Sequence, residues 1–299
     1  MILITGSTGQ LGQELVKLCT ERGLAFRAVS RPEFDFEQPG SVATCFATTN
    51  PTLVINAAAY TAVDKAETDQ DAARAGNHTG PLHLAQLCEA ANIPFIHVST
   101  DYVFDGGKGA PYVESDPTNP TGVYGATKRD GEAAILNNTT AKAIILRTSW
   151  VYAAHGKNFC NTMLAAARRL PTLRVVADQR GTPTAAPDLA QAILAIAARL
   201  QQTGWQPQYR GIFHATGAGE TTWHGFATAI FEAAAASQSP PEVQPITTAD
   251  WPTPARRPAD SRLDCTKLAE VFGVTLPPWR TSLGPIVQQL LALTSPPQP

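Results

Sequence analysis

Short apolar runs alternate with amphipathic stretches through much of this chain. Strands that alternate with helices are typical of βαβ units and a parallel sheet. We therefore predict an α/β fold with a Rossmann-type doubly wound parallel sheet that is completed late in the chain. The apolar runs lie at residues 2–4, 25–29, 53–55, 95–98, 143–146 and 211–214, and the helical patterns at 10–22, 128–136 and 188–200.

The periodicity loosens after residue 150, where prolines recur at short intervals. Proline removes a backbone donor and breaks both helical and strand patterns, so frequent prolines favour loops. We predict that residues 1–149 form a dinucleotide-binding domain and that the elements around 184–217 return to it. Residues 150–299 are then a smaller, loop-rich C-terminal substrate-binding region.

Composition narrows the class of protein. A formal net charge of −2 over 299 residues, without charge blocks, favours neither nucleic acid nor a membrane surface as partner. The five cysteines never form a C-x-x-C pair, which indicates core residues in a reducing compartment. Without a basic leader or a long apolar span, we expect a cytoplasmic protein. His78 and His83 are spaced too far apart for a metal pair on one helix face, so we predict no metal site.

Gly6, Gly9 and Gly12 follow the first predicted strand and lead directly into a helix. Glycines there let the turn close, let backbone N–H groups approach a diphosphate and let the helix pack on the strand. The helix N-terminus also favours negative charge. A tight turn without a ligand is the alternative, but the strand–turn–helix context favours a dinucleotide cofactor.

The end of the second predicted strand bears on which nicotinamide cofactor binds. An acid there holds the ribose of NAD, whereas arginine suits the extra phosphate of NADP. The sequence has Ser30 and Arg31, which favours NADPH with NADH as the alternative. Asp35 and Phe36 could flank the adenine, or form an ordinary surface loop.

Two later strand ends carry small or hydroxyl side chains. Alanines 57–59 would let a flat cofactor lie close to the backbone, although simple packing explains them equally well. Thr100 leaves a strand whose carboxyl end opens onto the ligand crevice of an α/β sheet, so it is placed to touch a substrate oxygen.

Tyr124 and Lys128 are the strongest chemical signal. Residues at i and i+4 share a helix face. A phenol titrates near pH ~10, and a neighbouring cation favours phenolate, which makes tyrosine useful as a general acid or base at neutral pH. Most Y-x-x-x-K matches are plain helix surface. After a phosphate turn and a Ser-Thr strand end, this one predicts a reductase in which Tyr124 supplies a proton and Lys128 tunes it.

With these residues the chain resembles the extended short-chain dehydrogenase/reductase family, and within it the dTDP-4-dehydrorhamnose reductases, over nearly its whole length. The motifs that carry the resemblance are Gly6-Ser-Thr-Gly-Gln-Leu-Gly12, Asn56-Ala-Ala-Ala-Tyr-Thr-Ala-Val-Asp-Lys-Ala-Glu67, Ser99-Thr-Asp-Tyr-Val-Phe104, Tyr124-Gly-Ala-Thr-Lys128, Arg147-Thr-Ser-Trp-Val-Tyr152 and Pro252-Thr-Pro-Ala-Arg-Arg-Pro258.

The resemblance implies reduction of the 4-keto group of dTDP-4-dehydro-6-deoxy-L-mannose, with hydride from NADPH or NADH and a proton from Tyr124. Thr100 would share the carbonyl hydrogen bond. The dTDP-sugar would be held by Thr100, Asp101, Tyr102 and Trp150, and the cofactor by Gly9, Gln10, Leu11, Asp35, Phe36, Ala59, Tyr60, Thr61, Tyr124 and Lys128.

Trp150 and the pair Arg256-Arg257 have a physical rationale as well. An indole can form an apolar wall for a sugar face, and guanidinium forks suit a diphosphate. A core tryptophan and solvated arginines are the respective alternatives. We name Trp150 and Arg257 as candidate substrate contacts.

One departure concerns magnesium. Some relatives resemble magnesium-linked dimers that use a glutamate at the position of Glu14 and a second one where this chain has Pro187, beside Asp188. This argues against a magnesium-bridged dimer, and both a monomer and a homodimer stay open.

Two other functions remain as alternatives. One is a catalytically silent regulatory subunit like the beta subunit of methionine adenosyltransferases, which resembles the same fold. The other is a reductase of a different nucleotide-activated 4-keto sugar, because the sequence does not show which base is read.

Overall fold

The computed structural model describes residues 1–236 and 239–294, and within them a six-stranded parallel sheet forms the larger of two parts. Its strand order is β10-β5-β4-β3-β1-β2, and every neighbouring pair is parallel. This confirms the predicted fold class, and the strand at 211–214 does complete the sheet. The strands are β1 (Ile2–Thr5), β2 (Phe26–Val29), β3 (Leu53–Asn56), β4 (Pro94–Thr100), β5 (Lys142–Thr148) and β10 (Gly211–His214).

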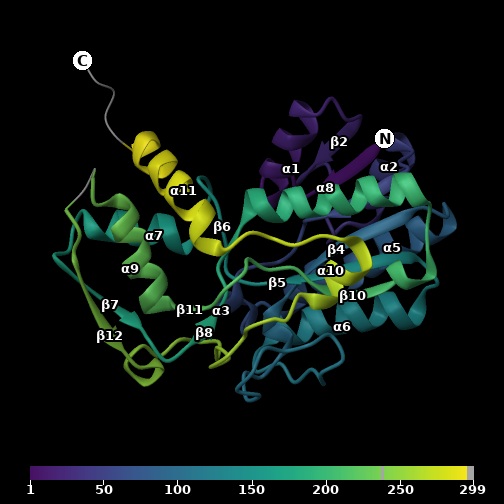
Figure 1. The fold of residues 1–299 in the computed structure, drawn as a ribbon. Helices are drawn as coiled ribbons and strands as arrows, with labels where there is room; N and C mark the ends of the chain where they lie inside the picture. The colour runs from purple at the N-terminus through teal and green to yellow at the C-terminus, as the bar shows by residue number, and fades with distance from the viewer. Residues whose placement is uncertain (237–238, 295–299) are drawn as a thin grey trace.

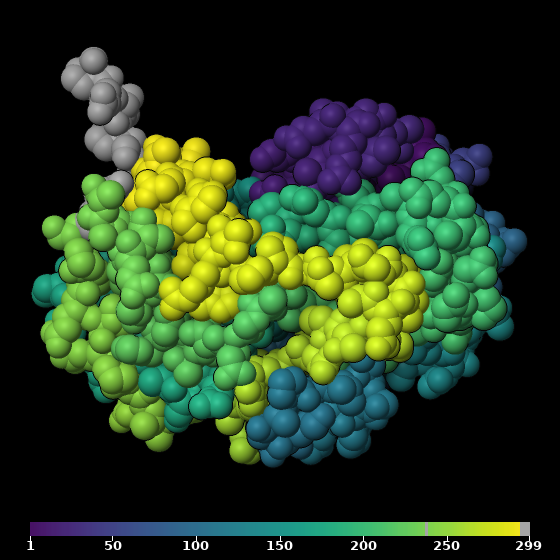
Figure 2. All heavy atoms as spheres, viewed as in Figure 1, coloured from purple at the N-terminus to yellow at the C-terminus, as the bar shows by residue number. Residues whose placement is uncertain are grey.

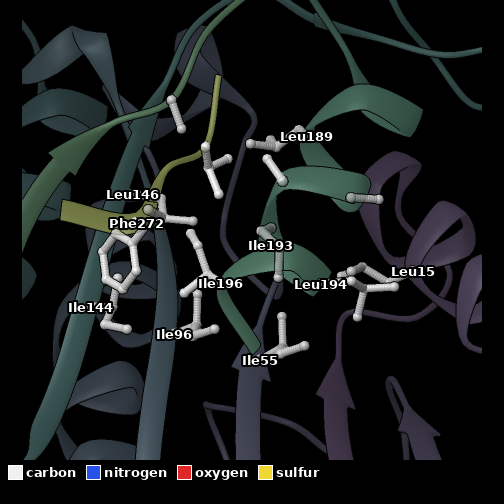
Figure 3. Close-up of a cluster of buried hydrophobic side chains, with 14 of the residues drawn as sticks. Leu15, Ile55, Ile96, Ile144, Leu146, Leu189, Ile193, Leu194, Ile196 and Phe272 are labelled. Atoms are coloured by element: carbon white, nitrogen blue, oxygen red, sulfur yellow. The ribbon is translucent and has the colours of Figure 1, made fainter. Parts of the chain in front are cut away.

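Helices cover both faces of this sheet because its strands are apolar on both sides. Ile4 and Ile55 point to one face, whereas Leu3 and Val54, one residue earlier, point to the other. Figure 3 shows the first of these two cores, in which Leu15 of α1 and Ile193 of α8 pack onto the sheet. One face carries α1 (Gln10–Glu21), α8 (Ala186–Thr203) and α10 (Thr266–Phe272); the other carries α2 (Pro39–Thr49), α5 (Gly80–Ala90) and α6 (Val123–Asn138).

The second part has its own core. Tyr152, Phe226 and Trp279 are buried in it together with side chains from a pair of parallel strands. It consists of α7 (Phe159–Ala167), β7 (Thr172–Val176), α9 (Trp223–Ala234), β12 (Glu242–Ile246) and α11 (Trp279–Thr294), with the short pairs β6 (Val151–Tyr152) to β9 (Thr184–Ala185) and β8 (Arg180–Gly181) to β11 (Thr221–Thr222).

Residues 150–299 contain more helix than their prolines suggest. Pro187 lies in the first turn of α8, where its missing N–H has no helical partner to lose, so it starts a helix rather than breaking one. Figures 1 and 2 show that the last stretch, drawn in yellow, runs from α10 on the sheet across the molecule to α11 on the second part.

The remaining elements are short. No helix among the described residues is long and apolar enough to cross a membrane. The short helices are α3 (Val63–Ala66) and α4 (Gln70–Arg74), followed by a single π-helical turn at Ala75–Thr79, and 3₁₀ turns lie at Asp101–Val103, Pro207–Tyr209 and Thr248–Asp250.

Candidate active site

A cleft of ≈ 690 Å³ lies at the carboxyl ends of the strands, between the phosphate turn and α6. The strand order reverses between β1 and β3, and this is where an open α/β sheet places its ligand crevice. Gly12 and Arg257 are not among its lining residues. The predicted site residues that do line it are Gly6, Gly9, Gln10, Leu11, Arg31, Asp35, Phe36, Ala59, Tyr60, Thr61, Thr100, Asp101, Tyr102, Tyr124, Lys128 and Trp150.

The glycine turn is shaped by close backbone approaches. Gly6 has φ 71°, and a Cβ there would lie 2.6 Å from the backbone nitrogen of Ala58. Gly12 stands behind the turn, because its Cβ would lie 2.1 Å from the Gly6 carbonyl oxygen, so it packs α1 against the strand. Gly9 is the N-cap of α1 and no side chain caps the helix. The first-turn N–H groups, which have no partner within a helix, therefore suit a diphosphate in the cleft.

Asn77, which the sequence did not reveal, anchors one wall of the cleft. Its Oδ1 accepts from the Tyr60 N–H (3.0 Å), and its Nδ2 donates to the Tyr60 carbonyl (3.0 Å) and to Thr127 Oγ1 (3.2 Å). Asn77 is fully buried in the π-helical turn, and Gly131 of α6 has no room for a Cβ beside its carbonyl. Turns of π-helix often occur at functional sites. The run Gly76-Asn-His-Thr-Gly80 was the only local signal.

Tyr124, Thr100 and Asp101 form the candidate reacting centre. The Thr100 hydroxyl lies close enough to the Tyr124 phenol to lower its pKa, and it donates to Asp101 Oδ1 at 3.1 Å. Burial raises the pKa of Tyr124 to about 12, and Thr100 lowers it. The phenol is therefore protonated at neutral pH and could donate its proton to a developing alkoxide.

Asp101 is an unusual carboxyl group. It is 1% exposed, and its Oδ2 has no hydrogen-bond partner among the described residues. Burial raises the pKa of Asp101 to about 7, against the lowering effect of hydrogen bonds from Ser261 and Thr100.

Lys128 lies on the same helix face as Tyr124, as predicted, but its ammonium group makes its contacts with β4. Nζ donates to the Val98 carbonyl (2.6 Å) and lies 3.4 Å from His97 Nε2. Burial lowers the pKa of Lys128 to about 8. The predicted tuning of the phenol by this cation is thus not the main influence on the pKa of Tyr124, which burial dominates.

A buried ion pair, also missed from the sequence, supports this helix. Arg147 Nη2 of β5 lies 2.6 Å from Glu132 Oε2, and both side chains are 3% exposed. Ser99 donates to the same carboxylate. Glu132 is one turn beyond Lys128 and raises the pKa of the ammonium group against the effect of burial.

Trp150 lines the cleft from the second part. Its backbone has φ 46°, and its ring stacks on Trp223 of α9 with centroids 3.6 Å apart and planes 9° from parallel. A Cβ on Gly181 would collide with the same indole. Trp223 and Gly181 therefore fix the indole of Trp150, which forms a rigid apolar wall of the cleft.

Arg257 makes a different contact from the predicted one. Its guanidinium pairs with both Asp64 carboxylate oxygens (2.6 and 2.8 Å), which raises the pKa of the arginine. Its charge also acts on Tyr102, a cleft residue, and lowers the pKa of that phenol against the effect of burial. Arg257 thus holds α3 in this structure and does not line the cleft.

The acidic residues considered for magnesium have other partners. Glu14 Oε1 lies 3.1 Å from His155 Nε2, and Asp188 accepts from the Ser282 hydroxyl at 2.6 Å. Among the described residues, no three histidine, cysteine, aspartate or glutamate side chains group as metal ligands.

Comparison with known proteins identifies the family. Residues 1–292 match the RmlD substrate binding domain. The dTDP-4-dehydrorhamnose reductase of Sinorhizobium fredii is 42% identical, over 97% of each chain. The crystal structure of the Clostridium acetobutylicum dTDP-4-dehydrorhamnose reductase superposes with a TM-score of 0.89 at 36% identity, over 97% of this chain and 99% of that one.

A second solved structure bears on the cofactor. It is the dTDP-4-dehydrorhamnose reductase of Bacillus anthracis in complex with NADP, with a TM-score of 0.86 at 30% identity, over 96% of this chain and 98% of that one. This chain belongs to the RmlD substrate binding domain family, together with these dTDP-4-dehydrorhamnose reductases.

Proposed function

We propose that this protein reduces the 4-keto group of dTDP-4-dehydro-6-deoxy-L-mannose to give dTDP-L-rhamnose, with NADPH as hydride donor. The observation that carries the proposal is the position of the Tyr124 phenol. It lies at the carboxyl edge of the sheet, in contact with Thr100, in the same cleft as an uncapped helix N-terminus. The names of the relatives supply the substrate.

The positions of the residues in and behind the cleft suggest which part of the cofactor each would hold. Gly6, Gly9, Gln10 and Leu11 would hold the cofactor diphosphate, and Gly12 keeps α1 close to the turn. Arg31 at the end of β2 would meet the 2′-phosphate that distinguishes NADPH from NADH, since a guanidinium suits a phosphate. Residues proposed to line the rest of the cofactor site are Asp35, Phe36, Ala59, Tyr60, Thr61 and Lys128.

The chemistry requires a hydride at carbon 4 of the sugar and a proton at its oxygen, and the bound nicotinamide supplies the hydride. Thr100 and Tyr124 would both hydrogen-bond the carbonyl oxygen. As negative charge develops there, the phenol passes its proton to the oxygen, a transfer that contributes about 10²- to 10⁴-fold. The raised pKa of Tyr124 keeps that proton in place at neutral pH until the oxygen becomes basic enough to take it.

The sugar nucleotide would be held by residues 150–299, apart from α8, β10 and α10, which belong to the sheet part. Trp150 would pack against a sugar face, and Asp101 and Tyr102 would contact the sugar beside Thr100. Five unpaired cysteines fit a reducing cytoplasm. We propose a cytoplasmic enzyme that acts as a monomer or a homodimer.

The test is NADPH oxidation, followed at its nicotinamide absorbance, with dTDP-4-dehydro-6-deoxy-L-mannose and with a panel of other nucleotide-activated 4-keto sugars. We expect turnover with the dTDP-rhamnose precursor above all others. Better turnover with a different keto sugar would replace the proposed substrate by that sugar. Absence of oxidation with every sugar, together with co-purification of a methionine adenosyltransferase, would favour a regulatory subunit instead.

A matched variant separates chemistry from binding. Tyr124→Phe removes only the hydroxyl, so we expect turnover to fall by about 10²-fold or more while the dissociation constant of NADPH changes less than threefold. Near-normal turnover by the Tyr124→Phe variant would remove Tyr124 from the proposed role.

A further inference from the structure

A row of polar side chains crosses the sheet beneath the cleft. Thr5 of β1, Asn56 of β3 and His97 of β4 are direct partners in the strand register. All three are fully buried and lie two residues after the apolar core side chains Leu3, Val54 and Phe95 of the same face. Polar groups in such a position need hydrogen bonds.

The hydrogen bonds of this row have a fixed direction. The Ala58 backbone N–H can only donate, and it donates to Asn56 Oδ1 (3.2 Å). The Thr5 hydroxyl donates to the same oxygen (2.5 Å). The amide nitrogen of Asn56 therefore faces His97 Nδ1, 2.8 Å away, and donates to it.

This direction determines the tautomer of His97. A neutral imidazole carries one N–H, so a ring that accepts at Nδ1 carries its proton on Nε2. His97 Nε2 lies 3.4 Å from Lys128 Nζ, and the ammonium form of that lysine can only donate. Two N–H groups would then face each other, whereas a neutral amine could accept from the imidazole.

We propose that His97 is a positioning residue that presents an N–H to Lys128 and thereby favours its unprotonated amine in the cofactor-free protein. Burial lowers the pKa of His97 well below its usual value, which keeps the ring neutral. The consequence of this effect on Lys128 for catalysis rests on the proposed function, in which Lys128 is a cofactor contact. The tautomer of His97 does not rest on the proposed function.

Other groups near Lys128 act on the same proton. On α6, Glu132 favours the ammonium form but is paired with Arg147 of β5, and Tyr124 lies one turn before. From β4, the Val98 carbonyl accepts from Nζ at 2.6 Å and suits either protonation state. His97 is thus the neighbour that points a fixed N–H at Nζ and so disfavours the positive charge of Lys128.

Two substitutions test whether the direction of these hydrogen bonds, and not merely their presence, acts on Lys128. Asn56→Asp replaces the donating amide by a carboxylate oxygen, which can only accept, so His97 must turn to the Nδ1–H tautomer and offer a lone pair to Lys128. Thr5→Val removes one donor to Asn56 but leaves Ala58 to fix the direction, so it is the matched control.

The experiment is NMR of the full-length, cofactor-free protein with ¹⁵N-labelled histidine and lysine, with signals assigned by His97→Gln and Lys128→Met. We expect His97 to carry its proton on Nε2 from pH 6 to 9. In Asn56→Asp we expect the His97 proton to move to Nδ1 and the Lys128 titration midpoint to rise by about one pH unit or more, and in Thr5→Val we expect neither change. A rise in the midpoint without the change of tautomer would come from the added negative charge alone and would overturn the link between the two residues.

An Nδ1–H or doubly protonated His97 in the unmodified protein would overturn the proposal, and this measurement needs no variant beyond the one that assigns the His97 signal. An unchanged Lys128 midpoint in folded Asn56→Asp would overturn the link between the two residues. Because neither readout uses the sugar or NADPH, a failure of the proposed reductase activity leaves this test intact.

Discussion

Removing the side chain of Asn77 should loosen the wall of the cleft formed by Tyr60. Asn77→Ala deletes three hydrogen bonds, two to the Tyr60 backbone and one to Thr127 on the helix of Tyr124. At about 0.5–1.5 kcal/mol each, with a larger penalty where a buried group is left unpaired, the loss amounts to about 2–4 kcal/mol of unfolding free energy. Because Tyr60 lines the cleft, NADPH affinity should fall at least tenfold, or about 1.4 kcal/mol.

Urea denaturation and a fluorescence titration with NADPH measure these two effects. Asn137→Ala, on the exposed surface of α6, is the matched control and should change the unfolding free energy by less than about 0.5 kcal/mol. If Asn77→Ala unfolds at the same urea concentration as the unmodified protein and binds NADPH within twofold of it, the assignment of Asn77 as an anchor is refuted.

Three further outcomes are expected. The raised pKa of Asp101, about 7, makes its carboxyl neutral below that pH and charged above it, where it repels a diphosphate; KM for the dTDP-sugar should therefore rise above pH 7, and Asp101→Asn should flatten this part of the pH profile. Trp223→Leu removes the ring stacked on Trp150, worth about 1 kcal/mol, so KM for the sugar should rise about fivefold while a titration shows unchanged NADPH affinity. Gly12→Ala places a Cβ 2.1 Å from the Gly6 oxygen, and the same titration should show NADPH affinity reduced at least tenfold.

The sheet was predictable because its signal is local. Each strand is a short apolar run, and three of the helices between the strands have a clear helical pattern. Both faces of the sheet are covered, so the runs did not need to alternate with polar residues. The phosphate turn and the Tyr124–Lys128 spacing are local as well. The order of the strands was not predicted, but parallel strands bring their carboxyl ends to one edge of the sheet, where the cleft lies.

What the sequence did not reveal depends on partners far apart in the chain. Asn77 holds Tyr60, 17 residues away, and Trp223 supports Trp150 from another helix. Arg257 suits a diphosphate by its chemistry, but Asp64, 193 residues away, takes its guanidinium. The contacts of Lys128 with β4 likewise depend on how α6 crosses the sheet, which helix spacing does not determine.

The most direct test of the central claim follows the hydride itself. NADPH carrying deuterium at both positions of nicotinamide carbon 4, so that either hydrogen transferred is labelled, is incubated with the protein and dTDP-4-dehydro-6-deoxy-L-mannose, and the product is examined by mass spectrometry and proton NMR. The proposed function predicts dTDP-L-rhamnose with one deuterium at carbon 4 of the sugar, formed far more slowly by Tyr124→Phe. Product without deuterium at carbon 4, or no product from a folded protein that binds NADPH, would contradict it.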